Sequence, residues 1–279
     1  MIDTTVVGWK DAASSRGVLD WALRHHKQGP ILLAHVVERG IALVETFAAD
    51  SPAAQARIDL MEVAEQVRTE NPSLTVHTEL LQGSPVDALE GLSGPRTMVA
   101  VSSRQGENRG ARSWSTGARL SGSARGPVAI VPSGARSGSG VVVGVDDPVE
   151  GALQFAADYA QRMGETLHAV RAWQGPPAWA EQGPTDPEYL LSLEQMYGDI
   201  LSDALERVST EYPELEIRRS VIQGEPREVL LEQSGGASLL VVGNRGLRGP
   251  KRFFLGSVSH ALVLAARVPT VVVNDSSET

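Results

Sequence analysis

The sequence repeats itself, and this repeat constrains the fold more than any other feature of the chain. Three segments of the first half return in the same order, at nearly the same spacing, in the second half. The matched pairs are Val6–Gly8 with Val142–Gly144, Leu81–Leu89 with Ile222–Leu230, and Gly126–Val131 with Val268–Val273. The period is too long for a solenoid, so the 279 residues are predicted to form two copies of a unit of about 135 residues.

A short linker separates the two copies. Pro132–Gly140 is rich in glycine and serine and contains no large apolar side chain, a composition typical of flexible connections. We therefore expect one domain over residues 1–133 and a second over residues 140–279. The final strand of each copy is apolar, and pairing of these edges within one chain would give a pseudo-dimer that protects both, with a homodimer as a further option.

Short runs rich in valine and leucine alternate with longer helical stretches in each copy. The second copy predicts strands at Val141–Val145, Thr166–Trp173, Leu215–Ile222, Leu239–Val242 and Thr270–Val273, and helices at Gly151–Arg162, Glu188–Glu211, Pro226–Glu232 and Ser257–Ala266. The first copy follows the same plan from Thr4–Gly8 to Val128–Pro132. This alternation is typical of an α/β fold with a parallel, doubly wound sheet, so we expect two such domains in tandem.

The composition disfavours or excludes several classes of protein. Hydrophobic residues make up 42% and charged residues 21%, which is enough apolar material for a packed core. The formal net charge of -9 disfavours a nucleic-acid binder, and the absence of cysteine excludes disulfides and thiolate metal sites. No run approaches the roughly 20 apolar residues of a membrane-spanning helix. The start lacks a signal-peptide pattern, so we expect a soluble, cytoplasmic protein without membrane partners.

A glycine-rich, basic loop follows the last strand but one of the second copy. Its pattern is Gly243-x2-Gly246-x9-Gly256-Ser257. Glycines let a phosphate approach the backbone, and a helix that starts near Ser257 adds free N–H groups and a hydroxyl donor. Ligands of parallel sheets bind beyond the carboxyl ends of strands, so the loop predicts a site for an anionic ligand. Four basic residues and no acidic residue lie within the loop: Arg245, Arg248, Lys251 and Arg252.

This loop differs from two common phosphate-binding motifs. Gly-x4-Gly-Lys-Ser/Thr is absent, and neither copy has Gly-x-Gly-x2-Gly after its first strand. A single glycine here would indicate only a turn or a helix start, and it is the full pattern between strand and helix that favours a ligand. Asp146, at the end of the first strand of the second copy, fits a ligand contact and the capping of a turn equally well.

These motifs resemble the universal stress protein family in its tandem two-domain form, over nearly the whole chain. The glycine-rich loop is similar to the family's ATP-phosphate signature, with support from Gly144-Val145-Asp146 and Gly224-x-Pro226. The resemblance implies a five-stranded fold like that of the adenine nucleotide alpha hydrolases and an ATP-binding stress-response regulator, with Mg²⁺ as the accompanying ion. Asp146 would then lie near the nucleoside, and the backbone of Ala172 would read the adenine. The phosphates and ribose would be held by Gly243, Gly246, Gly256 and Ser257, beside Arg245.

The first copy lacks the loop pattern. Ser102 and Gln105 stand at the positions of the first two loop glycines. Two registers stay open for the end of the loop, with Ser115-Thr116 or Trp114-Ser115 opposite the Gly-Ser pair. Lys10 stands opposite Asp146, and Asp11 is one residue late as a substitute. We therefore expect the first copy to bind ATP weakly or not at all and to keep a structural role. Binding of another anion stays open because of Arg104, Arg109, Arg112, Ser115 and Thr116.

Three functions remain open on the sequence alone. The first is the ATP-binding regulator, in which fast hydrolysis is not expected because the loop contains no general base, whereas slow hydrolysis stays open. The second is a nucleotide-independent interaction scaffold for an unknown protein partner. The third is an enzyme of another nucleotide-binding α/β family, which would need further catalytic motifs that the sequence does not show. Trp173 or Trp179 is expected either to cover the nucleotide pocket or, more simply, to pack on its own domain. No metal-ligand spacing occurs among His25, His26, His35, His77, His168 and His260.

Overall fold

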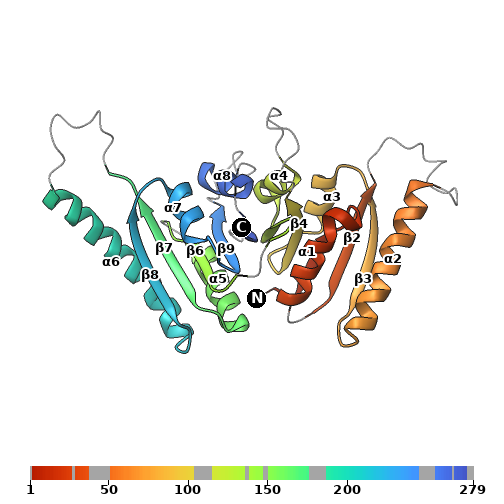
Figure 1. Cartoon of the computed structure of the whole chain (residues 1–279), viewed down its shortest axis with the longest axis horizontal. Coiled ribbons are helices and arrows are strands. Elements are labelled where there is room, and N and C mark those ends of the chain that lie inside the picture. The colour runs from red at the N-terminus through yellow and green to blue at the C-terminus, as the bar shows by residue number, and fades with distance from the viewer. Residues whose placement is uncertain are drawn as a thin grey trace. The chain divides into compact units, whose positions relative to one another are not determined.

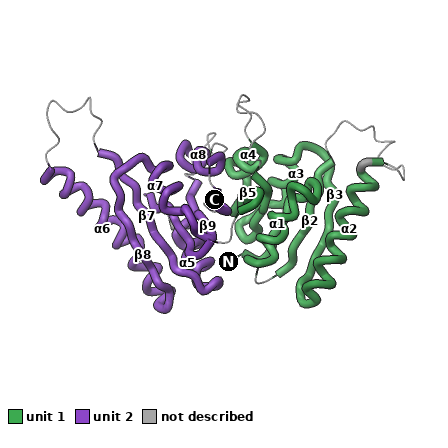
Figure 2. The backbone as a smooth tube through the Cα atoms, in the orientation of Figure 1, with its two compact units in different colours: residues 1–135, 245–255, 274–279 green, residues 136–244, 256–273 purple. Residues whose placement is uncertain are grey.

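The computed structural model describes most of the chain, and it divides the chain into two units that we treat separately (Figure 2). Unit 1 consists of residues 1–135 with 245–255 and 274–279, and unit 2 of residues 136–244 with 256–273. The described residues are 2–26, 29–37, 51–103, 115–135, 138–146, 150–175, 187–244, 255–265 and 267–274.

Within these described ranges, unit 1 alternates five strands with four helices (Figure 1). Its strand order is β3-β2-β1-β4-β5, and neighbouring strands are parallel. The central strand β1 is buried on both faces, with Val6 and Val7 at most 1% exposed, as expected for a parallel sheet covered by helices. The elements are β1 (Thr4–Gly8), α1 (Ala12–His25), β2 (Ile31–Val37), α2 (Pro52–Glu70), β3 (Val76–Gln82), α3 (Pro85–Gly91), β4 (Thr97–Ser103), α4 (Thr116–Ser123) and β5 (Val128–Pro132).

Unit 2 repeats this plan, with β6 as its central strand. The order is β10-β9-β6-β7-β8, so the strands occupy the same relative positions as in unit 1. Helices α5 and α6 contact the sheet on one side, and α7 and α8 on the other. The elements are β6 (Val141–Gly144), α5 (Glu150–Met163), β7 (Leu167–Trp173), α6 (Pro187–Glu211), β8 (Ile217–Gln223), α7 (Pro226–Gln233), β9 (Leu239–Asn244), α8 (Ser257–Ala265) and β10 (Thr270–Asn274).

The α/β fold predicted from the sequence is therefore confirmed in each unit, with small changes at the element boundaries. The largest change among the strands is in β8, which begins at Ile217 rather than at Leu215. Leu215 instead belongs to the turn after α6, where its N–H donates to the carbonyl of Tyr212. A turn residue that continues an apolar alternation cannot be separated from a strand by periodicity alone.

Matching backbone hydrogen bonds fix which residues of the two units are equivalent. The Trp9 N–H donates to the Ala34 carbonyl at 2.8 Å, and the Val145 N–H donates to the Val170 carbonyl at 2.9 Å. Lys10 therefore stands where unit 2 has Asp146.

The same comparison holds further along the chain. The Val99 N–H donates to the Pro127 carbonyl and the Leu240 N–H to the Pro269 carbonyl, so Ser102 corresponds to Gly243. The alignment of this strand end, expected from the sequence, is confirmed.

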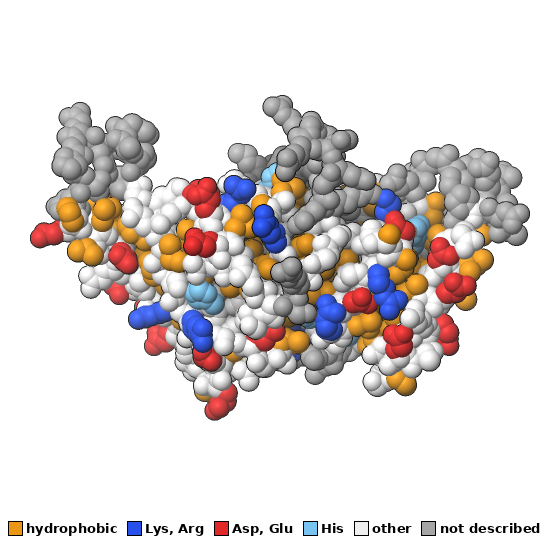
Figure 3. All heavy atoms as spheres, in the orientation of Figure 1, with side chains coloured by type: hydrophobic (Ala, Val, Ile, Leu, Met, Phe, Trp, Pro, Cys, Tyr) orange, Lys and Arg blue, Asp and Glu red, His pale blue; other side chains and the backbone are white. Residues whose placement is uncertain are grey.

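Two properties of the described surface bear on function. Basic and acidic side chains are interspersed on the face shown in Figure 3, rather than segregated into fields of one sign. Of the helices that the structure describes, none has the length and apolar character needed to cross a membrane.

Candidate functional site

The predicted nucleotide residues that the structure describes all lie at the carboxyl edge of the unit 2 sheet. Asp146 follows the end of β6 and is exposed, and Ala172 is the last residue but one of β7. Gly243 is the last residue but one of β9. Gly256 and Ser257 stand at the start of α8. Two further predicted residues, Arg245 and Gly246, lie outside the described residues.

The first turn of α8 begins at a residue that cannot cap it. The first N–H groups of any helix lack partners within the helix, and a side chain of the preceding residue usually accepts from one of them. Gly256 precedes Ser257 and has no side chain. A Cβ built on Gly256 would find its nearest neighbour, Ser259 Oγ, 4.0 Å away. The described residues, which do not include 245–254, therefore leave room beside the first turn, and an anion there would meet N–H donors and the positive end of the helix dipole.

The backbone conformation does not explain the glycine at this position. Gly256 is not among the six glycines with positive φ in the described part of the chain. The absence of a side chain is thus what distinguishes Gly256 from other residues.

Two hydrogen bonds tie the end of β9 to the start of α8. The Gly256 N–H donates to Asn244 Oδ1 at 3.3 Å, and the Ser259 hydroxyl donates to the Gly243 carbonyl at 2.7 Å. Asn244 is 5% exposed and Ser259 is 6% exposed. Both ends of the glycine-rich loop are therefore fixed by the side chains of Asn244 and Ser259, which are not part of the Gly-x2-Gly-x9-Gly-Ser pattern.

Unit 1 closes the same junction differently. Ser115 precedes α4, and its hydroxyl accepts from the Ala118 N–H at 3.1 Å. A side-chain cap therefore occupies a donor of the first turn. Alanine at 118 replaces Ser259, and the buried Ser103 Oγ, at the position of Asn244, has no partner among the described residues. Neither of the two links of unit 2 is present in unit 1.

The structure also settles the register that the sequence left open. The Arg119 N–H donates to the Ser115 carbonyl, and the His260 N–H donates to the Gly256 carbonyl. Ser115 and Thr116 thus stand opposite Gly256 and Ser257, and the register with Trp114 opposite Gly256 is excluded.

The acidic substitute proposed for unit 1 has another task. Asp11 is the N-cap of α1, and its carboxylate accepts from the Ser14 N–H and the Ser14 hydroxyl, both at 2.8 Å. These hydrogen bonds lower the pKa of Asp11. Because the Asp11 carboxylate caps a helix and Lys10 holds the position of Asp146, unit 1 lacks an equivalent acidic group there.

Some glycines of the family motifs have a packing role instead. A Cβ at Gly144 would lie 2.9 Å from Leu230 Cδ1, and a Cβ at Gly224 would lie 2.8 Å from Val229 Cγ2. Both contacts are too short for a side chain, so these glycines let α7 approach the sheet.

Trp173 packs inside its own domain. It is 4% exposed, and its ring stacks on Tyr197 of α6 at a centroid distance of 5.6 Å. The simpler of the two sequence expectations for this residue is therefore confirmed.

Sequence patterns did not single out Asn244 or Ser259. Each is a polar residue beside a signature residue, and Ser259 is buried near the start of an apolar helix. A buried polar residue at such a place indicates a hydrogen bond, but only the structure identifies its partner.

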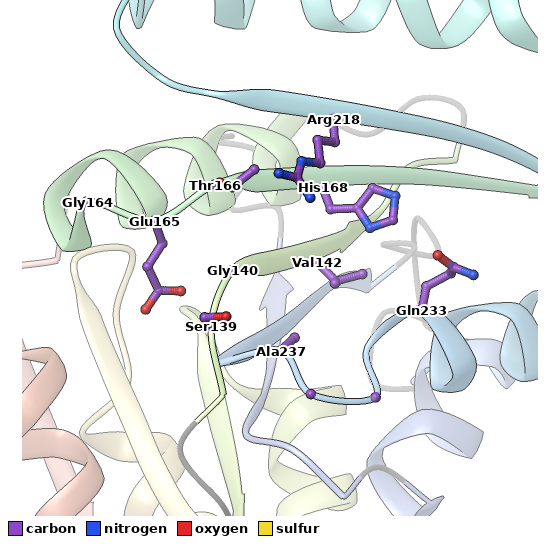
Figure 4. Close-up of a pocket in the computed structure, with 12 residues that line it drawn as sticks. Ser139, Gly140, Val142, Gly164, Glu165, Thr166, His168, Arg218, Gln233 and Ala237 are labelled. Carbon is purple, nitrogen blue, oxygen red and sulfur yellow. The ribbon is translucent and has the colours of Figure 1, made fainter.

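A cavity of about 490 Å³ lies at the opposite edge of the same sheet (Figure 4). Its walls include His168 from the start of β7 and Arg218 from the start of β8. His168 shares a hydrogen bond of 2.8 Å with the Ser220 hydroxyl, and Arg218 pairs with Glu216 at 2.9 Å. Burial lowers the pKa of His168, with a smaller contribution from Arg218. Both groups are already paired, and we assign no nucleotide to this edge.

Comparisons with known proteins agree with the architecture. A sequence model of the universal stress protein family matches residues 140–274. Universal stress protein Rv1996 of Mycobacterium tuberculosis is 32% identical over 76% of this chain and 69% of its own length. Universal stress protein Rv2005c of the same organism is 30% identical over 95% of this chain and 93% of its own. The crystal structure of a universal stress protein from Archaeoglobus fulgidus shares the fold, with a TM-score of 0.69 and 18% identity, and covers 97% of this chain and 98% of its own.

Proposed function

The chain belongs to the universal stress protein family, and on this premise we propose that it is a stress-response regulator that binds ATP in unit 2. The family sequence model matches residues 140–274, which lie in the second half of the chain. The observation that carries the proposal is the difference at the helix start. Gly256 offers the first turn of α8 no side-chain cap, and no described residue fills the space beside it, whereas Ser115 caps the first turn of α4.

Each site residue has a distinct role in this proposal. The N–H groups at the start of α8 and the Ser257 hydroxyl bind phosphate oxygens, and Gly243 and Gly246 let the phosphates approach the backbone. Arg245 adds positive charge. Asp146 accepts from the nucleoside hydroxyls, and the backbone of Ala172 forms hydrogen bonds with the adenine.

Mg²⁺ accompanies the nucleotide in this proposal. The described residues contain no group of three His, Asp or Glu side chains that could hold a metal. In this proposal the phosphates and water hold most of the ion's coordination sites, as is common for Mg²⁺ with nucleotides. We assign no catalytic residue, and any hydrolysis would be slow. The cytoplasmic location expected from the absence of a signal-peptide pattern remains part of the proposal.

A nucleotide-independent scaffold is the second candidate, and one observation favours it. Helix α6 exposes three large apolar side chains, with Tyr189 48%, Leu191 64% and Met196 44% exposed. Such residues can contact a partner protein. Pairing of the two copies or of two chains through the final strands also remains a prediction.

Calorimetric titration with ATP, ADP, AMP and cyclic AMP separates the two candidates. We expect one ATP site per chain, and no site in a variant that carries Gly243→Val and Gly256→Val. The matched control is Ser115→Ala in unit 1, which should keep the full stoichiometry. Two sites in the original chain, one of which survives in the double variant, would refute a silent unit 1. Absence of binding for all four nucleotides would favour the scaffold.

A further inference from the structure

On the α6 side of the unit 2 sheet, a buried arginine has two nitrogens without an acceptor among the described residues. Arg171 of β7 is only 6% exposed, and its Nε and Nη1 atoms have no hydrogen-bond partner among the described residues. Its guanidinium carbon lies 5.1 Å from the centroid of the Tyr197 ring. The neighbouring Trp173 stacks on the same tyrosine, and its Nε1 atom is likewise buried without a partner. Three buried N–H-bearing nitrogens thus belong to two side chains that contact the same tyrosine ring, and none has an acceptor among the described residues.

The guanidinium is the informative member of this cluster. An unpartnered indole alone would mean little, because Trp21 of unit 1 has one too. A buried cation is different, since its removal from water is costly unless an anion or several acceptors compensate. The contact with Tyr197 supplies only part of that compensation.

The fold itself does not require this cluster. The two helices α2 and α6 can be aligned by the equivalent turns that follow them. The Asn71 N–H donates to the Val67 carbonyl after α2, and the Tyr212 N–H donates to the Val208 carbonyl after α6. The equivalent positions in unit 1 are occupied by His35, Val37 and Ala56. Unit 1 thus builds the same strand and helix without a guanidinium and without the two aromatic rings.

We propose that the Arg171–Trp173–Tyr197 cluster is a second ligand site, specific for an oxyanion group, either a carboxylate or a phosphate. The cluster offers N–H donors and a positive charge, so its ligand must supply acceptors and negative charge. The Tyr197 ring covers one side of the guanidinium and keeps water from it, which strengthens the attraction of the guanidinium for an anion.

This site is separate from the proposed nucleotide site. Side chains at alternate positions of β7 face opposite sides of the sheet. Arg171 and Trp173 face α6, and His168 lines the cavity together with Gln233 of α7. The α8 start belongs to the side of α7, which α8 contacts. Failure of ATP to bind would therefore leave the oxyanion proposal intact.

The proposal can be tested by thermal unfolding of the full chain in sodium phosphate or in sodium acetate. Sodium chloride keeps the ionic strength of the buffers equal. The Gly256→Val variant serves as background, so that the glycine-rich loop does not contribute. We expect at least one oxyanion to raise Tm, by about 2–3 °C at tenfold excess over Kd. A rise with phosphate alone indicates a phosphate ligand, and a rise with acetate indicates a carboxylate. Absence of a rise with both would overturn the proposal.

The Arg171→Met variant supplies the decisive comparison. Without an oxyanion, its Tm should equal or exceed that of the parent, because an unpaired buried charge is replaced by an apolar side chain of similar length. The oxyanion-dependent rise should disappear. A lower Tm in oxyanion-free buffer would indicate that the guanidinium already has a partner within the chain, and a persistent rise would show that the oxyanion binds elsewhere. Either result overturns the proposal.

Two further variants keep the test decisive if Arg171→Met does not fold. Trp173→Phe keeps a ring against Tyr197 and removes only the indole N–H, and it should weaken oxyanion binding several-fold. An unchanged response in Trp173→Phe would count against the cluster. Arg218→Met removes an exposed arginine of β8, 69% exposed and paired with Glu216, and should keep the full response.

Discussion

Units 1 and 2 have the same strand order, but they join the fourth strand to the fourth helix in opposite ways. In unit 1 the Ser115 hydroxyl caps α4, and no described side chain links β4 to the helix start. In unit 2 the residue before the helix is Gly256, which has no side chain to cap it, while Asn244 and Ser259 bind β9 to α8 from neighbouring positions. The comparison shows that one position can hold either a capping serine or a glycine, and our proposal makes the glycine form an anion site. The fold accepts both, so the choice can be made by a few side chains.

The change with the largest expected effect converts unit 2 to the arrangement of unit 1. In Gly256→Ser, the new hydroxyl would accept from the first turn of α8 and occupy the open space beside it. Because one hydrogen bond to a charged group contributes about 1.5–3 kcal/mol, ATP affinity should fall by about 10- to 100-fold in calorimetric titration. The Tm should not decrease, since serine is a good N-cap.

Gly198→Ser is the matched control for this change. A Cβ at Gly198 of α6 meets no atom within 4 Å, so the substitution adds the same side chain far from the loop. Equal ATP affinity in Gly256→Ser and Gly198→Ser would contradict the role of the open helix start.

The two links that are specific to unit 2 should have the next largest effect. Asn244→Ala and Ser259→Ala each remove a buried hydrogen bond and should lower the free energy of unfolding by about 1 kcal/mol. ATP affinity should fall about 3- to 10-fold, since the loop ends are no longer held. Urea denaturation and titration measure the two effects.

Unit 1 provides the control for these links. Ser103→Ala removes a hydroxyl that has no described partner, so the free energy of unfolding should change by less than about 0.5 kcal/mol. Comparable losses for Ser103→Ala and Asn244→Ala would mean that the Asn244 bond contributes nothing specific.

The cap of unit 1 predicts an effect on stability alone. Ser115→Ala should destabilise the chain by about 1 kcal/mol, and Ser115→Gly by only a few tenths. ATP binding should be unaffected in both, because the site is assigned to unit 2. A loss of affinity in Ser115→Ala would show that unit 1 takes part in binding.

The smallest expected effect concerns pH and is confined to unit 2. Burial lowers the pKa of His168 below its ordinary value of 6.5, so the unfolded chain takes up the proton more readily than the folded chain. The stability due to neutral His168 is fully present above pH 6.5 and decreases as the pH falls below it. The His168→Gln variant should lose less stability between pH 7 and pH 5 in urea titrations. Parallel losses in the two proteins would contradict this assignment.

The sequence predicted the fold well because periodicity and repetition are properties of whole segments. Buried valine runs such as Val141–Val143 and the recurrence of Gly-x-Pro at 83 and 224 are visible without coordinates. The site was less predictable, because its details depend on single hydrogen bonds. The capping role of Asp11, the register at Ser115 and the links through Asn244 require the three-dimensional arrangement. The isolation of Arg171 could not be read from the sequence, since a basic residue in a strand gives no sign of which groups surround it.

The separation between Asn244 and Gly256 is the same as that between Ser103 and Ser115, and this has a consequence for protein engineering. The two intervals start at equivalent strand ends and stop at equivalent helix starts. They can therefore be exchanged as cassettes with no change in the length of the chain, although the exchange replaces buried residues such as Ala118 by Ser259. A chain in which residues 244–259 replace residues 103–118 of unit 1 would test whether ATP binding can be transferred to unit 1. In the reverse exchange, unit 2 would carry the unit 1 sequence, and neither unit is then expected to bind ATP.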